Sequence, residues 1–314
     1  MEKKRVLSGM RPSGKLHLGN FLGALSNWND LQQDYQCFFF IADWHALTSD
    51  YADTSEIKNP EKSTLFIQSR VPEHAELHLL LSMITPLPWL ERVPSYKEQR
   101  QEIKDKDLET YGFLGYPVLQ AADIIIYKAD FVPVGIDQAP HVEMTREIVR
   151  RFNNLYKKTV FSEPAVLLTE VPKLAGTDGR KMSKSYNNAI YLSNPPKVIE
   201  GKLKTMMTDP QRVRRTDPGN PDVCPVFSLH KIFSSDEERA NIDPACRTAA
   251  IGCIDCKEIL AKNLLARMSP VYEKRTRLAE KPSDVLEILE NGSQRARQVA
   301  ARTLAEAREA MKID

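Results

Sequence analysis

The stretch SGMRPSGKLHLGN, residues 8–20, decides how the first part of the chain folds. The short apolar run that leads into it is typical of a buried strand, and its PSG triplet gives a turn signal. After the turn, apolar residues recur at helical spacing from Leu18 to Leu31. The sequence therefore predicts a strand, a tight turn and a helix whose first turn holds residues 17–20.

The same stretch begins like a phosphate-binding P-loop, with Gly9, four further residues, and then Gly14 and Lys15. A P-loop continues with Ser or Thr, whose hydroxyl binds Mg²⁺. The next residue here is Leu16, which cannot bind a metal ion. The stretch is therefore not a P-loop, but a helix that starts after a glycine turn still favours an anionic ligand such as a phosphate.

Strands and helices alternate over the first part of the chain. The runs CFFFIAD (37–43), TLFIQS (64–69) and FVPVGIDQ (131–138) are typical of further strands, and helical patterns lie between and after them. This alternation predicts an α/β fold with a doubly wound parallel sheet.

Composition divides the chain near LSNPPK, residues 192–197, because strand signals are scarce beyond it and helix formers dominate. We expect a sheet domain over 1–190 and a helical domain over 191–314. The 44 basic and 42 acidic residues leave a net charge of +2, so a nucleic-acid partner would need a local basic patch. Because no apolar run is long enough for a bilayer or a signal core, we expect a cytoplasmic protein.

A second motif lies far downstream, in GRKMSKSYN, where KMSKS occupies residues 181–185. Together with HLGN at 17–20 it resembles the two signatures of class I aminoacyl-tRNA synthetases. The stretches YPVLQAADI and VPVGIDQ narrow the resemblance to the tryptophanyl-tRNA synthetase family, over most of the chain. The resemblance implies a Rossmann-like catalytic domain with an insertion at about 72–116, followed by a helical anticodon-binding domain.

Two alternatives stay open. The tyrosyl enzymes share fold and motifs, but they carry a Tyr where Leu7 stands, and Leu7 offers no partner for a substrate phenol. In the tryptophanyl interpretation Asp123 accepts the indole N–H, and a buried acceptor rejects ligands that lack the donor. The second alternative is a non-catalytic RNA-binding relative, which the intact signature lysines and His17 disfavour.

The resemblance implies a two-step reaction in which tryptophan is activated by ATP with Mg²⁺ and then transferred to tRNA(Trp). It assigns catalytic roles to His17, Asn20, Lys181 and Lys184. It assigns ATP binding to Arg11, Pro12, Ser13, Gly19, Asn20, Gly135, Ile136, Asp137, Lys181, Met182, Ser183, Lys184 and Ser185. It assigns tryptophan binding to Leu7, Tyr116, Gln120, Asp123, Val132, Val134 and Gln138. Gly19 is expected to leave room for the adenine ring.

One nearby histidine receives no such role. His141 and Glu143 are two residues apart in an expected helix, so they do not face each other and suit structural positions better than a metal site.

The connection before the third strand departs from the resembled family. Only about 20 polar residues lie between Asp43 and TLFIQS, whereas a parallel crossover normally carries a helix of a dozen residues or more. The family has such a helix here. Either a crossover helix near 44–63 is truly missing, which would leave one face of the sheet with less cover, or residues are missing from the sequence as given.

Cysteines supply a further signal. Cys37 lies in an apolar strand and is expected to be a buried thiol, whereas the other four fall within 33 residues. Such clustering favours a metal site over disulfides, and four thiolates suit either a 4Fe–4S cluster or zinc. A subset of the resembled family carries a 4Fe–4S cluster with very similar spacing, which favours iron–sulfur. The expected ligands are Cys224, Cys246, Cys253 and Cys256.

The resemblance also implies two macromolecular partners. The cluster is expected to order the neighbouring basic run of Arg212, Arg214 and Arg215, which would then meet the anticodon region of the tRNA. A homodimer is expected, with subunits meeting near 72–116, where the apolar stretch HLLLSMITPLPWL fits an interface as well as a core.

Overall fold

The computed structural model describes residues 3–12, 14–50, 65–94, 96–98, 108–168, 174–184 and 186–313. The chain forms two compact units. The first unit comprises Met1–Gly14, Asn27–Glu170 and Pro282–Asp314. The second comprises Lys15–Ser26 and Val171–Lys281. In the described part of the chain, no helix is both long enough and apolar enough to cross a membrane.

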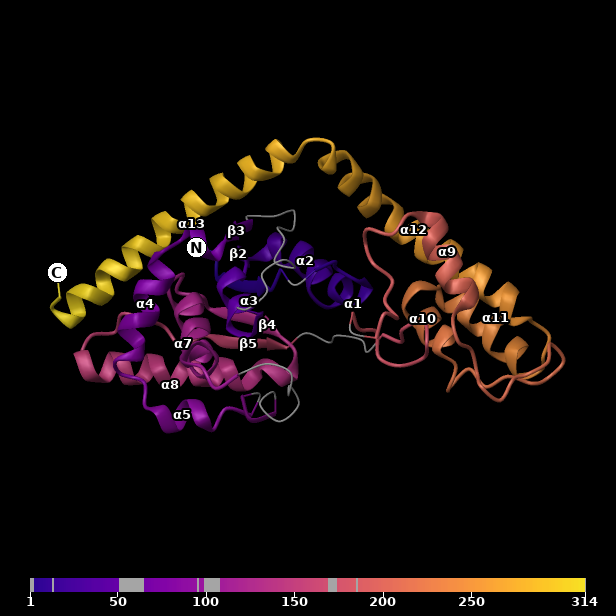
Figure 1. The fold of residues 1–314 in the computed structure, drawn as a ribbon, viewed down its shortest axis with the longest axis horizontal. Helices are drawn as coiled ribbons and strands as arrows, with labels where there is room; N and C mark the ends of the chain where they lie inside the picture. Colours follow the sequence, from indigo (N-terminus) through magenta and orange to yellow (C-terminus); the bar gives the residue numbers. More distant parts are fainter. Residues whose placement is uncertain are drawn as a thin grey trace. The chain divides into compact units, whose positions relative to one another are not determined.

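A five-stranded parallel sheet forms the centre of the first unit (Figure 1). Its strands run in the order β3-β2-β1-β4-β5, and every neighbouring pair is parallel. The chain moves outward from β1 to β3 and then returns to β4 on the other side of β1, so the carboxyl ends of β1 and β4 form a topological switch point. The strands are β1 (Arg5–Met10), β2 (Gln36–Ile41), β3 (Leu65–Ile67), β4 (Phe131–Val134) and β5 (Ala165–Leu168).

The doubly wound α/β prediction is confirmed, and the four expected strands are present. Strand β5 was missed because its four residues are exposed or only partly buried, which removes the apolar signal of an interior strand. The helices of this unit are α2 (Ser26–Asp34), α3 (Asp43–Asp50), η2 (Gln68–Arg70), α4 (Glu73–Ser82), α5 (Leu87–Glu91), α7 (Tyr111–Ile125), η3 (Ile136–Gln138), α8 (Ala139–Tyr156) and α13 (Pro282–Met311).

The core of the first unit lies between the sheet and helices α4, α7 and α8. Aromatic rings join the two sides, with Phe38 of β2 stacked 4.7 Å from the ring of Tyr127 after α7. Helix α7 is apolar nearly all round, from Phe113 to Ile125, because neighbouring elements cover it on several sides. This rigid helix carries several of the expected site residues.

The C-terminal helix α13 covers the free edge of strand β3. A Cβ at Gly292 would lie 2.5 Å from the Leu65 carbonyl oxygen, so this close approach requires glycine. The hydroxyl of Ser293 accepts a hydrogen bond from the Ile67 backbone N–H at 3.4 Å. Residues Pro282–Asp314 therefore group with the sheet unit, and the compact units depart from the expected border at residue 190.

The structure describes only part of the connection before β3 in which a crossover helix was expected to be missing. Helix α3 occupies Asp43–Asp50, and Asp43 accepts hydrogen bonds from the backbone and hydroxyl of Ser69. Residues 51–64 lie outside the described residues. The edge strand to which this segment leads is covered by α13.

The second unit is helical and contains both signature motifs. Its elements are α1 (Leu18–Asn20), the π-helical turn η1 (Phe21–Leu25), α9 (Pro196–Thr205), α10 (Pro225–Phe233), α11 (Asp236–Arg247) and α12 (Cys253–Ala279). Its core joins Leu18 to Leu174, Met182 and Leu264. Two backbone hydrogen bonds, Leu18 N–H to Ile190 and Leu192 N–H to Leu16, connect the residues around the first motif to those after the second.

Candidate active site

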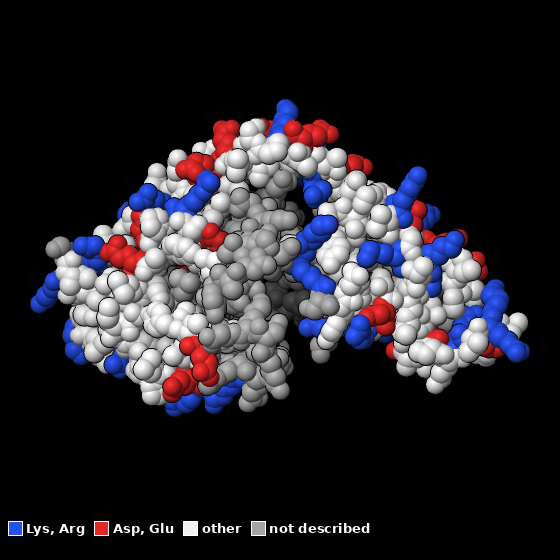
Figure 2. Space-filling view, viewed as in Figure 1, with Lys and Arg blue, Asp and Glu red and all other residues white. Residues whose placement is uncertain are grey.

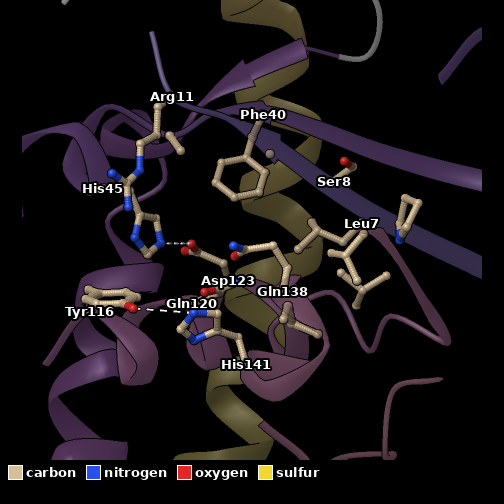
Figure 3. A pocket seen from close by; sticks show the side chains of 16 residues that line it. Leu7, Ser8, Arg11, Phe40, His45, Tyr116, Gln120, Asp123, Gln138 and His141 are labelled. Atoms are coloured by element: carbon tan, nitrogen blue, oxygen red, sulfur yellow. Dashed lines mark hydrogen bonds and ion pairs between the residues drawn. The ribbon is translucent and has the colours of Figure 1, made fainter. Parts of the chain in front are cut away.

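A cavity of about 460 Å³ opens at the carboxyl ends of β1, β2 and β4 in the first unit (Figure 3). Its volume lies within the range of small-molecule sites. The wall combines apolar side chains with a few polar groups that point inward, as such sites commonly do. It is lined by Leu7, Ser8, Gly9, Arg11, Phe40, Ala42, His45, Tyr116, Gln120, Asp123, Ile124, Val132, Pro133, Val134, Gln138 and His141.

All seven side chains that the sequence assigned to an amino-acid site line this single cavity. Tyr116, Gln120 and Asp123 lie at positions i, i+4 and i+7 of α7, so the helix presents them on one face. Leu7 comes from β1, and Val132 and Val134 from the neighbouring β4. The switch point of the sheet therefore brings residues more than 100 positions apart into one wall.

The carboxylate of Asp123 is fully buried and fully engaged. The Nε2 amide of Gln68 donates to both oxygens, at 2.8 and 2.9 Å. His45 Nε2 lies 2.8 Å from Oδ2, and His74 Nδ1 contacts Oδ1. The other ring nitrogen of His74 lies 2.7 Å from the Tyr127 hydroxyl, which extends the network into the core.

These contacts keep the carboxyl ionised. Burial raises the pKa of Asp123. The charge of His74 and the hydrogen bonds from His45 and His74 outweigh this effect and lower the pKa to about 2. An ionised carboxylate accepts hydrogen bonds and cannot donate them. The cavity therefore presents an acceptor that suits a ligand N–H.

His141 also lines the cavity, beside Tyr116 (Figure 3). The Tyr116 hydroxyl lies 3.3 Å from Nε2 of His141. Burial lowers the pKa of His141 to about 4, with further lowering by His45 and Arg11. We expected a structural role for this histidine because its helical neighbour Glu143 does not face it. The missing signal was position: His141 begins the helix that follows β4, where ligand-binding residues of such sheets gather.

Seven further lining residues were not predicted: Ser8, Gly9, Phe40, Ala42, His45, Ile124 and Pro133. Gly9 and Phe40 form one contact, since a Cβ at residue 9 would lie 2.5 Å from the Phe40 ring. His45 and Ala42 follow β2 directly, as polar and small residues at a strand end often do in binding clefts. The position of His45 after a buried strand was the signal that could have found it.

The HLGN motif is ordered by its own hydrogen bonds in the second unit. The Gly19 backbone N–H donates to His17 Nδ1, and the His17 backbone N–H donates to Asn20 Oδ1, each at 3.0 Å. In the neutral ring, an accepting Nδ1 places the proton on Nε2. His17 Nε2–H and the Asn20 amide group are therefore the donors that a ligand could meet.

Burial lowers the pKa of His17, and the nearby Lys184 lowers it further. Lys184 of the second signature thus lies close to the first signature within the same unit. A Cβ at Gly19 would lie 2.7 Å from the His17 ring, so the glycine makes room for that ring. This contact does not test the expected role of Gly19 in leaving room for the adenine ring, which stays a prediction.

The KMSKS segment is held by a residue that the motif does not contain. Asn188 is buried and accepts a hydrogen bond from the Ser183 backbone N–H at 2.8 Å. Its amide donates to the Lys181 carbonyl at 3.1 Å and to the Asp178 carboxylate at 2.6 Å. Met182 packs in the core of the second unit, whereas the side chain of Lys181 is exposed.

The remaining expected ATP residues are described only in part. Arg11 lines the cavity, and Pro12 directly follows it. Gly135 precedes the single turn η3, in which Ile136 is exposed and Asp137 lies beside the Gly135 backbone. Ser13 and Ser185 lie outside the described residues.

The four clustered cysteines lie in the second unit, at the starts of α10 and α12 and near the end of α11. All are free thiols. Burial raises the pKa of Cys256 to about 12, and the other three cysteines raise it further, so the four thiols lie near one another. Across the described residues, however, no three His, Cys, Asp or Glu side chains are arranged to hold a metal ion.

Cys37 is only half-buried, although burial raises the pKa of its thiol to about 11. The expectation of a fully buried thiol is therefore wrong, because Cys37 lies near the exposed start of β2.

The three arginines beside the cysteines do not form one exposed patch. Arg212 is buried, and its guanidinium donates to the carbonyls of Arg215 and Ile251. Arg215 donates to the carbonyls of Ala249 and Ala250. Arg212 cannot meet RNA as expected, because its charge is used inside the loop, whereas Arg214 is exposed.

Known proteins resemble the chain over nearly its whole length. The model of tRNA synthetases class I (W and Y) matches residues 1–269. The tryptophan–tRNA ligase of Thermotoga maritima is 53% identical over 326 residues, covering 98% of this chain and 99% of that protein. The corresponding ligase of Aquifex aeolicus is 43% identical over 394 residues, covering 98% of this chain and 100% of that protein.

A solved structure agrees with these sequence matches. The crystal structure of tryptophanyl-tRNA synthetase from Campylobacter jejuni, complexed with ADP and tryptophan, superposes with a TM-score of 0.86 at 34% sequence identity. The match covers 98% of this chain and 99% of that one. The chain belongs to the class I tRNA synthetases of the tryptophan and tyrosine family.

Proposed function

We propose that the protein is a tryptophan–tRNA ligase. The observation that carries the proposal is the cavity at the switch point, where an ionised, buried Asp123 lies in a wall of apolar and aromatic side chains. Such a wall suits a flat aromatic side chain, and the carboxylate suits its N–H. Relatives that are 53% and 43% identical over nearly their full length carry this name, which favours tryptophan over tyrosine.

The reaction needs no side-chain nucleophile. The tryptophan carboxylate attacks the α-phosphate of ATP, pyrophosphate leaves, and a terminal ribose hydroxyl of tRNA(Trp) then attacks the acyl-adenylate. Mg²⁺ enters with ATP as part of the substrate. The protein contributes by positioning the reactants and by neutralising the charge that develops on the phosphates.

Individual residues supply these contributions. His17 donates from Nε2–H, because its Nδ1 is held by the Gly19 backbone. Lys181 and Lys184 stabilise the leaving pyrophosphate. On the amino-acid side, Asp123 accepts the indole N–H, while Leu7 and the valines of β4 pack on the ring.

Amino-acid-dependent exchange of labelled pyrophosphate into ATP tests the proposal. Tryptophan should support exchange, and tyrosine should not, because a phenol presents its hydroxyl at a different distance from the backbone and leaves Asp123 without the indole donor. Exchange with tyrosine alone would identify a tyrosyl enzyme. The absence of exchange with both amino acids would favour a non-catalytic RNA-binding relative.

We also propose that Cys224, Cys246, Cys253 and Cys256 hold a 4Fe–4S cluster. Four free thiols that lie near one another suit iron–sulfur chemistry. The four cysteines would hold the cluster through their thiolates, and the proposal over zinc rests on the resemblance in their spacing. When bound, the cluster would order the loop-rich segment around it rather than carry electrons for the reaction.

Protein purified without oxygen tests the cluster. It should be brown and contain about four irons per chain, as a four-cysteine cluster requires. Cys253→Ser should lose the colour and weaken tRNA charging more than adenylate formation. Colourless protein with stoichiometric zinc would refute the iron–sulfur assignment.

The tRNA is proposed to bind the helical part of the second unit, which corresponds to the expected anticodon domain. Figure 2 shows many Lys and Arg side chains on the face of this unit that the view presents. Exposed basic residues there include Lys204 of α9, Lys262 and Arg267 of α12, and Arg214. Such local groups can bind phosphates even though the net charge is only +2. These activities place the protein in the cytoplasm, where tRNA is charged.

A homodimer is proposed through the segment at about 72–116. Leu79 of α4 and Met83, the residue directly after this helix, have exposed fractions of 52% and 71%, and Leu87 of α5 is 59% exposed. Large apolar groups that gather on a surface are typical of interfaces. Light scattering at micromolar concentration should give twice the mass of the chain, and a monomer would refute the dimer.

A further inference from the structure

The buried carboxylate of Asp123 leaves no room for a further donor. A carboxylate offers about four acceptor positions on its two oxygens. Gln68 uses one on each oxygen, His74 uses the second on Oδ1, and His45 uses the second on Oδ2. Asp123 is also 0% exposed, so no ligand can touch it unless one of these three groups moves.

Only one of the three donors faces the cavity. His45 lines it, whereas Gln68 and His74 do not and are 0% exposed. In Figure 3 the ring of His45 lies beside the Asp123 carboxylate and is joined to it by a dashed line. His45 can therefore leave the carboxylate by rotating into open space, whereas His74 is fixed by Tyr127 on its far side.

Hydrogen bonds to residues of η2 anchor the backbone around His45. The His45 backbone N–H donates to Gln68 Oε1 at 3.4 Å. Asp43, two residues earlier, accepts from the Ser69 backbone N–H at 3.1 Å. These bonds hold the first turn of α3 against η2, so a change at His45 requires only a rotamer change and no movement of the helix.

We propose that His45 occupies the place of the indole N–H in the unliganded protein and yields it when tryptophan binds. Gln68 and His74 act as positioning residues that keep Asp123 fixed throughout the exchange. This inference rests on the proposed function, because it takes the indole N–H as the incoming donor. Its consequence concerns selectivity: a ligand that lacks the N–H leaves His45 on Asp123, so the carboxylate stays satisfied and the penalty for that ligand is smaller than it would be without His45.

The test compares two ligands in calorimetric binding assays without ATP. One is tryptophan, and the other is its benzothiophene analogue, in which sulfur replaces the indole N–H. Wild-type protein should bind tryptophan more tightly. The ratio of the analogue's dissociation constant to that of tryptophan should rise about tenfold or more in His45→Ala. The reason is that the analogue then leaves a buried charged acceptor unpaired.

Two further variants make the result specific. His45→Gln supplies an amide donor and should return the ratio toward the wild-type value. Thr48→Ala on the same helix removes only a hydroxyl that bonds to the His45 carbonyl, and it should leave the ratio unchanged. In wild-type protein with labelled histidine rings, the His45 NMR signal should move with tryptophan and stay in place with the analogue.

The outcomes separate the two proposals. A ratio near one in both wild-type protein and His45→Ala would show that Asp123 does not accept the indole N–H, and it would overturn the site assignment and the exchange together. A wild-type ratio well above one that His45→Ala leaves unchanged would overturn the exchange alone. A His45 signal that moves equally with both ligands would do the same.

Discussion

The cavity wall of the first unit and the signature segments of the second are stabilised in opposite ways. In the cavity, the key polar group, Asp123, is fully buried and has all its acceptor positions filled by side chains from three other elements. In the second unit, the backbone of the KMSKS segment is held by Asn188, while Lys181 extends into solvent. In the proposed function, selection of the amino acid would depend on a pre-formed buried network, and catalysis on lysines carried by an anchored turn.

Asp123→Asn should produce the largest effect and tests the first half of this comparison. The amide can turn a donor toward the indole and toward His45, so tryptophan affinity should fall several hundred-fold while ATP affinity changes little. Calorimetric dissociation constants for both ligands measure this. Equal losses for tryptophan and ATP would show a general collapse of the fold instead.

Lys181→Ala and Lys184→Ala should each slow adenylate formation about 100-fold and leave tryptophan affinity nearly unchanged. Such a pattern is expected when a contact forms only in the transition state. Single-turnover kinetics give the rate, and Lys281→Ala, at an exposed lysine between α12 and α13, is the matched control. If tryptophan affinity fell as much as the rate, the lysines would not have the proposed role.

Asn188→Ala should cost about 2 kcal/mol of unfolding free energy, because it leaves the Ser183 N–H and the Lys181 carbonyl without their partner. Adenylate formation should slow as the signature lysines lose their support. Urea unfolding and single-turnover rates check both effects. Asn187→Gly, at an exposed residue with φ of 51°, should change neither appreciably.

Acidification should lower the free energy of unfolding by a smaller amount, through a histidine of the cavity wall. The pKa of His141 is lowered from 6.5 to about 4, chiefly by burial, so the unfolded chain binds the proton more readily than the folded one. Stability is therefore lost as the pH falls from 6.5 toward 4, by about 1.5 kcal/mol between pH 6.5 and 5. His141→Gln should flatten the pH dependence of urea unfolding in this range, and an unchanged slope would contradict the assignment.

The sequence predicted much of the sheet, because strands depend on local patterns, and the family resemblance predicted half of the residues that line the cavity. Apolar runs bounded by turns located β1 to β4, and the spacing of Tyr116, Gln120 and Asp123 follows from one helix face. Every residue assigned to the amino-acid site lines the cavity. Those assignments came from a family resemblance, and their roles in binding remain predictions.

Other features could not be predicted because they depend on contacts between distant segments. Nothing in the local sequence around Gly292 shows that its helix packs on β3, more than 200 residues earlier. The burial of Arg212 depends on carbonyls more than 30 residues away. The partners of Asp123 come from positions 45, 68 and 74, none of which carries a motif that points to residue 123.

The contact between α13 and β3 has a consequence for synthesis on the ribosome. The outer edge of β3 carries backbone groups that α13 covers, and Ser293 satisfies one of them. A nascent chain therefore completes strands β1 to β5 well before residues 282–311 emerge, and during that interval the edge is open to pairing with another chain. Chains that end prematurely within α13 should consequently aggregate or be degraded, although all the residues of the cavity and of both signatures have already been made.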